Sequence, residues 1–127
     1  MSDVPGDNTH SQKLLEDGRS PGTPKSYALL EDDTKNLYMK FYKHTYEKSS
    51  LDRKVKEFIA IAAALTSGCK NCLNGHIKKA IKFGATRQEI SETIAVTLGV
   101  AAATIVDRSD IASADLGITI DDLPQGS

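Results

Sequence analysis

The stretch SGCKNCLNGHIKKA (residues 67–80) contains both cysteines of the chain and one of its three histidines. Cys69 and Cys72 are three residues apart, and His76 follows Cys72 by four. On a helix that begins near Cys69, these three side chains would share one face. Gly68 comes directly before Cys69 and suits a helix break. The stretch therefore predicts a short loop and then a helix that presents two thiols and an imidazole together.

The rest of the chain reads as helix. Residues 25–123 contain no proline, and proline is the residue that most strongly breaks helices. We found no alternating strand pattern, so the predicted fold class is all-α, a helical bundle of about five helices. Residues 1–25 are rich in Gly, Pro, Ser, Asp and Asn, and we expect a flexible tail there. One domain is expected over 26–117, with a C-terminal tail at 118–127.

Local signals mark the ends of the expected helices. Ser50 or Asp52 can cap the second helix. Thr86 with Glu89 three residues later forms a capping box that opens the fourth. Gly84 is placed to end the third in a left-handed C-cap. The expected helices span about 28–48, about 51–67, about 69–83, about 86–103 and about 104–116.

Apolar spacing predicts which faces of these helices are buried. The segment VTLGVAAA (residues 96–103) is small and apolar on nearly every side, so we expect either a core helix or an interface between subunits. The apolar row of the second helix consists of Val55, Phe58, Ile59, Ala62 and Leu65, and that of the third of Leu73, Ile77, Ala80 and Ile81.

Composition excludes several classes of partner. The chain has 127 residues, of which 39% are hydrophobic and 26% charged, and its net charge is -1. This balance provides no general field for nucleic acid or for an anionic membrane. The N-terminus lacks the basic and then apolar run of a signal peptide, and we expect no membrane-spanning segment. The sequence thus predicts a cytoplasmic protein that binds neither nucleic acid nor membranes.

The close spacing of Cys69 and Cys72 indicates a chemical role for the thiols rather than a structural disulfide, since disulfides are rare in reducing compartments. The N-terminus of a helix stabilises a thiolate, and His76 can accept or return a proton. Glu57 is the candidate that orients His76, provided that the second helix folds back at Gly68. The two side chains would then meet directly or through a water.

The residues of this cluster carry a family resemblance. Glu57, eleven intervening residues, Cys69-x-x-Cys72, three more residues and then His76 resemble the signature of the AhpD-like alkylhydroperoxidases within the carboxymuconolactone decarboxylase family. The continuation KKAIKFGATRQEISETIAV is similar as well, and the resemblance covers roughly residues 30–116. It implies an all-α homo-oligomer, a hexamer or trimer, whose dithiol reduces a small hydroperoxide and is restored by a dithiol or a thioredoxin-like reductant.

The resemblance also implies roles. Cys72 would attack the peroxide, Cys69 would resolve the sulfenic acid, and His76 with Glu57 would relay the proton, without cofactor or metal. Position at the helix start favours Cys69 as the more exposed thiolate, but proximity to His76 favours Cys72, and we adopt the latter. Asn71 stands where the family motif has a second histidine, which argues against fast peroxide turnover but leaves the thiol chemistry intact.

Other interpretations stay open. His76 and Glu57 could serve as acid and base of a cofactor-free lactone decarboxylase or isomerase, with idle thiols. Alternatively, the cluster could bind zinc or sense redox state in an interaction module. Taken alone, Glu57 would be a solvated carboxylate paired with Arg53 or Lys54. We expect His10 and His44 to have no role, and Tyr38, Phe41, Tyr42 and Tyr46 to serve in packing.

Overall fold

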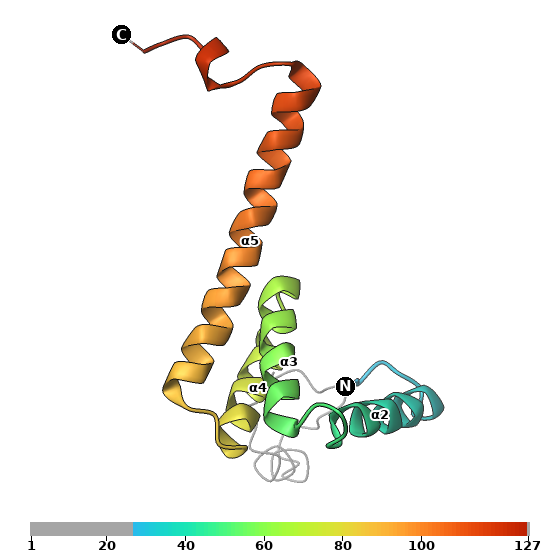
Figure 1. Cartoon of the computed structure of the whole chain (residues 1–127). Coiled ribbons are helices and arrows are strands. Elements are labelled where there is room, and N and C mark those ends of the chain that lie inside the picture. Colours follow the sequence, from blue (N-terminus) through green and yellow to red (C-terminus); the bar gives the residue numbers. More distant parts are fainter. Residues whose placement is uncertain (1–26, 127) are drawn as a thin grey trace, which may run out of the picture. The chain divides into compact units, whose positions relative to one another are not determined.

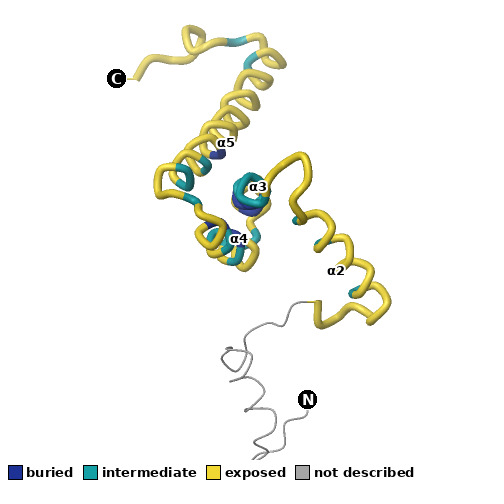
Figure 2. The backbone as a smooth tube through the Cα atoms, turned by 60° about the horizontal axis from the view of Figure 1, so that its bottom comes forward, coloured by how far each residue is buried: buried dark blue, intermediate teal, exposed yellow. Residues whose placement is uncertain are grey.

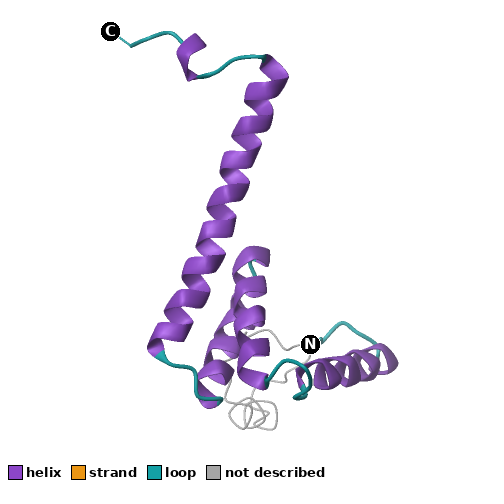
Figure 3. Cartoon of the chain, viewed as in Figure 1, coloured by secondary structure: helices purple, strands orange, loops and turns teal. Residues whose placement is uncertain are grey.

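A computed structural model describes residues 27–126, and every regular element among them is helical (Figures 1 and 3). This confirms the predicted all-α class. The tail predicted for residues 1–25 lies outside the described residues. The elements are α2 (Asp32–Tyr46), α3 (Arg53–Ser67), α4 (Lys70–Lys82), α5 (Arg87–Leu116) and a short 3₁₀ helix, η1 (Ile120–Asp122).

The local end signals are used as predicted. The Asp52 carboxylate caps α3 by accepting a hydrogen bond from the backbone N–H of Val55 at 3.1 Å. Gly68 ends α3 in the left-handed conformation with φ 77°, which glycine adopts without a Cβ clash. Thr86 and Glu89 form the full capping box at the start of α5. Short-range chemistry thus sets these three helix ends.

The prediction of a separate fifth helix was wrong. Residues 104–116 continue α5 without a break, and the helix ends only at Gly117, with φ 66°. A single glycine such as Gly99 costs a helix only about 1 kcal/mol relative to alanine, and the alanine-rich residues after it favour helix. The first helix is shorter than expected, because residues 27–30 form a turn closed by the Leu30 N–H and the Tyr27 carbonyl at 3.2 Å.

The chain divides at His44 into two compact units. In the first unit, the Tyr38 ring lies among three other aromatic rings, those of Tyr27, Phe41 and Tyr42, with centroid distances of 5.1, 6.3 and 6.4 Å respectively. A hydrogen bond with Tyr38, assisted by burial, raises the pKa of Tyr27. The aromatic residues of α2 up to Tyr42 thus contact one another, but the expectation that they serve in packing is met only in part, because Phe41 is 64% exposed.

In the second unit, α3 packs against both α4 and α5. The buried positions gather on α3 and α4, as the dark blue segments of Figure 2 show. Ile61 is fully buried, and Gly68 allows α4 to fold back along α3. This small core holds the helical hairpin that positions the site. Its buried apolar residues are Ala60, Ile61, Ala64 and Ala80.

The predicted buried rows were partly wrong. Ile59 is 54% exposed and Leu65 36%, and on α4 Ile81 is 59% exposed. The face of α3 that is buried instead contains Glu57, Ala60, Ile61 and Ala64. Periodicity finds apolar rows on a helix, but α3 carries two of them, and only the position of α4 decides which row is covered.

Helix α5 differs from α3 and α4 in its exposure. Thr97 is its one buried residue, although large apolar side chains run along its length. By length and composition alone, α5 is long and apolar enough to cross a membrane, which we did not anticipate from the sequence. The sequence from 96 to 103, expected to be a core helix or a subunit interface, is exposed in the single chain except at Thr97.

Candidate functional site

Cys69 and Cys72 lie at the first turn of α4 and are joined by a disulfide, with their Cα atoms 5.3 Å apart. Cys69 is the N-cap residue, and its backbone N–H donates to the Ala64 carbonyl at 3.0 Å. Cys72 is exposed and Cys69 half-buried. Because the pair lies at an open helix N-terminus, molecules in solution can approach it, and the helix dipole favours a thiolate after reduction.

The α3–α4 hairpin brings Glu57 and His76 into direct contact. His76 Nδ1 lies 2.7 Å from Glu57 Oε1. Glu57 is fully buried and the side chain of His76 is 11% exposed. The contact needs no bridging water. A carboxylate removed from water in this way requires partners for both of its oxygens.

Arg53 supplies the second partner. Its Nε–H donates to Glu57 Oε2 at 3.0 Å, one helical turn away on α3. The guanidinium also lies over two rings, 5.4 Å from the Tyr46 centroid and 4.5 Å from that of Phe83. Cation–π contacts of this kind hold a guanidinium in place. From the sequence, we considered a pair of Arg53 with a solvent-exposed Glu57. The pair is present, but Glu57 is buried and also binds His76.

Tyr46, the last residue of α2, completes the surroundings of the imidazole. Its ring is nearly parallel to that of His76, with an angle of 19° and a centroid distance of 5.5 Å, and its hydroxyl lies 3.5 Å from His76 Nε2. The Lys79 ammonium lies 5.9 Å from the Tyr46 centroid. Both nitrogens of the imidazole therefore have a polar neighbour, and the ring lies between Tyr46 and Glu57.

Sequence reasoning placed Tyr46 among packing residues and considered Arg53 only as a surface ion-pair partner. The spacing of Arg53 and Glu57, four residues apart on a helix, could have suggested a role at the site. No local signal links Tyr46 to His76, because thirty residues separate them in the chain. Only the tertiary arrangement brings these two rings together.

An ion pair away from the two cysteines connects helices α3 and α5. Lys54 Nζ donates to Glu89 Oε1 at 3.1 Å, and the same glutamate accepts from the Thr86 backbone N–H at 2.9 Å in the capping box. The hydrogen bond from Lys54 and then that from Thr86 lower the pKa of Glu89. This ion pair fixes the start of α5 against α3.

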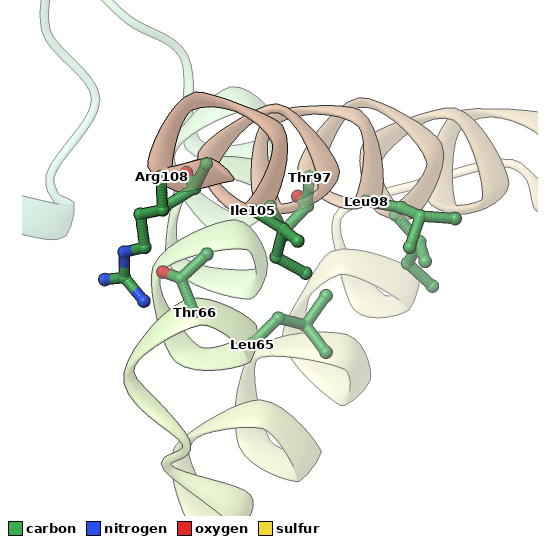
Figure 4. Close-up of a pocket in the computed structure, with 9 residues that line it drawn as sticks. Leu65, Thr66, Thr97, Leu98, Ile105 and Arg108 are labelled. Atoms are coloured by element: carbon green, nitrogen blue, oxygen red, sulfur yellow. The ribbon is translucent and has the colours of Figure 1, made fainter. Parts of the chain in front are cut away.

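A pocket of about 530 Å³ lies between the end of α3 and the middle of α5 (Figure 4). Leu65 and Thr66 come from α3, while Leu98, Ile105 and Arg108 come from α5. The lining is mostly apolar and contains none of the predicted catalytic residues. Within residues 27–126, no group of three or more His, Cys, Asp or Glu side chains is arranged to hold a metal ion.

These features define a small helical protein with a Cys-x-x-Cys disulfide at a helix start and a buried Glu–His pair behind it. The chain belongs to the carboxymuconolactone decarboxylase family, whose sequence pattern matches residues 32–108. It is 31% identical over 77 residues to "Uncharacterized protein 4 in cox locus" of Paracoccus denitrificans, a match that covers 56% of this chain and 69% of that one.

Solved structures show the same fold. A carboxymuconolactone decarboxylase family protein of Thermotoga maritima, described with a suggested role in an antioxidative response, aligns over 67% of this chain and 88% of its own, with TM-score 0.54 and 21% identity. A protein of Methanobacterium thermoautotrophicum aligns over 65% and 94%, with TM-score 0.60 and 20% identity. A family member from Legionella pneumophila aligns over 73% and 71%, with TM-score 0.52 and 22% identity.

Proposed function

We propose that this protein is a thiol-dependent peroxidase of the alkylhydroperoxidase type. The observation that carries the proposal is the Cys69–Cys72 disulfide at the start of α4, one turn before a histidine that a buried glutamate holds in place. A base of fixed orientation beside a thiol is the arrangement that activates a sulfur nucleophile. The suggested antioxidative role of the Thermotoga maritima protein points the same way.

The proposed cycle begins with the reduced protein. The Cys72 thiolate attacks the terminal peroxide oxygen, an S–O bond forms, the O–O bond breaks, and the departing alkoxide takes a proton from His76. The Cys69 thiol then attacks the sulfur of the sulfenic acid, so that a disulfide forms and water leaves. An external dithiol or thioredoxin-like protein reduces this disulfide and becomes oxidised itself. Because such donors are kept reduced in the cytoplasm, we propose that the protein acts there.

The test is peroxide consumption by the reduced protein. We expect the wild type to consume an organic hydroperoxide in the presence of a dithiol and Cys72→Ser to lose this activity. Cys69→Ser keeps the attacking sulfur, so once it has been reduced and freed of dithiol it should react once and accumulate a Cys72 sulfenic acid that a dimedone-type reagent labels. Equal rates for the wild type and Cys72→Ser would refute the proposal. Labelling at position 69 in Cys72→Ser would instead exchange the two sulfur roles.

A second candidate is a cofactor-free decarboxylase or isomerase that acts on a small lactone. The buried contact between Glu57 and His76 favours it, since a carboxylate and an imidazole can act as acid and base without any contribution from sulfur. The double variant Cys69→Ser/Cys72→Ser separates the two functions. A lactone-converting activity that survives in this variant and disappears in His76→Gln would select the second candidate.

We also propose that the chain assembles with copies of itself. Along α5, large apolar residues are between 41% and 70% exposed: Ile94, Val96, Leu98, Val100, Ile105, Val106, Ile111 and Leu116. Fully exposed aliphatic side chains present about 100 Å² each, so these eight present roughly 500 Å². Residues two apart, such as Val96 and Leu98, lie on opposite faces of the helix, so this area serves contacts with more than one copy rather than one standard interface of about 800 Å² per partner.

A second copy suits this surface better than a lipid bilayer does. The last part of α5 carries Asp107, Arg108 and Asp110, and charges are costly within a membrane. The start of α5 is docked on α3 by the Lys54–Glu89 ion pair, as in a folded water-exposed unit. The apolar pocket that includes Ile105 offers a place for side chains of the second copy, and the resemblance to the family favours a trimer or hexamer.

Sedimentation of the full chain tests this assembly. The wild type should have a mass that is a multiple of the monomer, and Ile105→Glu should lower it because a carboxylate would replace an apolar side chain in the contact between copies. Gln88→Glu adds the same charge to an exposed polar position of α5 and should leave the mass unchanged. A monomeric wild type, or a wild type that binds phospholipid vesicles through α5, would refute the proposal.

A further inference from the structure

We propose that the Tyr46 hydroxyl stabilises the disulfide form of the site by occupying His76 Nε2, and that it gives up this nitrogen when Cys72 becomes a thiol. Tyr46 would then be a positioning residue that shifts the redox equilibrium of the Cys69–Cys72 pair. This inference rests on the proposed function, because it takes the disulfide as the oxidised half of a working cycle.

The hydrogen bonds of Glu57 decide the tautomer of the imidazole. Glu57 accepts from Arg53 through one oxygen and faces His76 Nδ1 through the other, at 3.0 and 2.7 Å respectively. A carboxylate accepts hydrogen bonds and does not donate them, so Nδ1 carries the proton. In the neutral ring Nε2 is then the acceptor, and the Tyr46 hydroxyl, 3.5 Å away, is the donor that faces it.

In the proposed function, the same nitrogen receives the proton of the Cys72 thiol. Nε2 has a single lone pair, so it can accept from one donor at a time. In the disulfide form neither sulfur has a proton to donate, and Tyr46 is the donor that faces Nε2. When a dithiol breaks the disulfide, it supplies two electrons and two protons. The proton of the Cys72 thiol, one turn before His76 on α4, then competes with the tyrosine hydroxyl for Nε2.

The other contacts that the structure shows around His76 and Tyr46 do not involve Nε2. Glu57 binds His76 at Nδ1 and Arg53 binds Glu57, while the Arg53 guanidinium and the Lys79 ammonium lie over the Tyr46 ring. The near-parallel stacking of Tyr46 on His76 belongs to the ring and would be kept by phenylalanine. The hydroxyl can therefore be removed without removing the packing.

Tyr46→Phe tests the proposal through the redox equilibrium rather than through turnover. Each protein is equilibrated with mixtures of reduced and oxidised glutathione, and the fraction of free thiols is measured. Because a separation of 3.5 Å is long for an O–H···N bond, a net contribution at the low end is expected, and the disulfide of the variant should be about two- to five-fold easier to reduce. This corresponds to roughly 10–20 mV for a two-electron couple.

Tyr38→Phe is the matched control. Tyr38 lies two turns earlier on the same helix and its hydroxyl pairs with Tyr27, so its removal should leave the equilibrium unchanged. An unchanged equilibrium in Tyr46→Phe, or a disulfide that becomes harder to reduce, would overturn the inference. If the wild-type disulfide is not reduced reversibly by any of the mixtures, the proposed function itself fails, which is a different result.

A second measurement does not depend on thiols at all. Nitrogen-15 chemical shifts of His76 in the oxidised protein should show a protonated Nδ1 and an unprotonated Nε2. In Tyr46→Phe the Nε2 resonance should move toward the value of an imidazole nitrogen without a donor. A proton on Nε2 in the oxidised wild type, or an Nε2 shift that does not respond to the loss of the hydroxyl, would contradict the assignment.

Discussion

Glu57→Gln is the change that tests the site most directly. In the native protein, the two carboxylate oxygens of the fully buried Glu57 are paired with donors, His76 Nδ1–H and Arg53 Nε–H. Glutamine has almost the same shape, but it has one acceptor oxygen and an NH₂ group that can only donate. Whichever way the amide is turned, an N–H group faces another N–H group.

The magnitude follows from this mismatch. A buried donor left without an acceptor costs about 1–3 kcal/mol, and the loss of a charge-assisted bond adds to it. The Arg53 side chain is 30% exposed, so its guanidinium can regain water. We therefore expect the lower part of this range, a loss of about 1–2 kcal/mol in the free energy of unfolding.

A change of tautomer in His76 would relieve the mismatch, but it should lower the reactivity of the Cys72 thiol. If the imidazole moves its proton to Nε2, Nδ1 can accept from the glutamine NH₂. Nε2 is then no longer a base for the Cys72 thiol. Because the thiolate is the nucleophile and an ordinary thiol is still about 3% thiolate at neutral pH, alkylation of the Cys72 thiol should slow by up to about 30-fold.

Two assays on one protein decide the matter. Urea unfolding gives the stability, and iodoacetamide modification of reduced Cys69→Ser gives the reactivity of Cys72 alone, with and without Glu57→Gln. Glu47→Gln removes a carboxylate at an exposed position and should alter neither quantity. A variant that loses stability but alkylates at the native rate would refute the role of Glu57 in orienting His76.

Three further predictions concern the helices that hold the site. The hydrogen bond from Lys54 lowers the pKa of Glu89 in the folded protein. The ionised Glu89 therefore stabilises the fold above the pKa that this carboxyl has in the unfolded chain, and this stabilisation is lost as the pH falls through its lower pKa in the folded protein. The difference in the free energy of unfolding between wild type and Glu89→Gln, measured by urea unfolding, should shrink from pH 7 to pH 3. Asp52→Ala removes the cap on α3 and should cost about 1 kcal/mol in the same measurement, whereas Asp52→Asn should retain most of it. Gly68→Ala places a Cβ on a residue with φ 77° and should lower the free energy of unfolding by about 1–2 kcal/mol. An unchanged melting temperature would contradict this.

Local sequence signals predicted several helix ends, because a cap depends on atoms within a few residues. Asp52, Thr86 and Gly68 act where the sequence placed them. The division of α5 into two helices was wrong for a related reason, since neither Gly99 nor any residue near 104 is a strong enough breaker. The catalytic roles given to the cysteines, His76 and Glu57 stay predictions, which the variants above address.

The sequence by itself determined that the chain is helical, that two cysteines and a histidine share the first turns of α4, and that Glu57 can reach that histidine, because all of this depends on short spacing and one hairpin. The tertiary structure decided which apolar row of α3 is buried, that the large apolar residues of α5 remain exposed in a single chain, and that Tyr46 and Arg53 belong to the site. The physical reason is the same in each case. Helical periodicity describes one element, whereas burial and long-range hydrogen bonds depend on which element comes to lie against it.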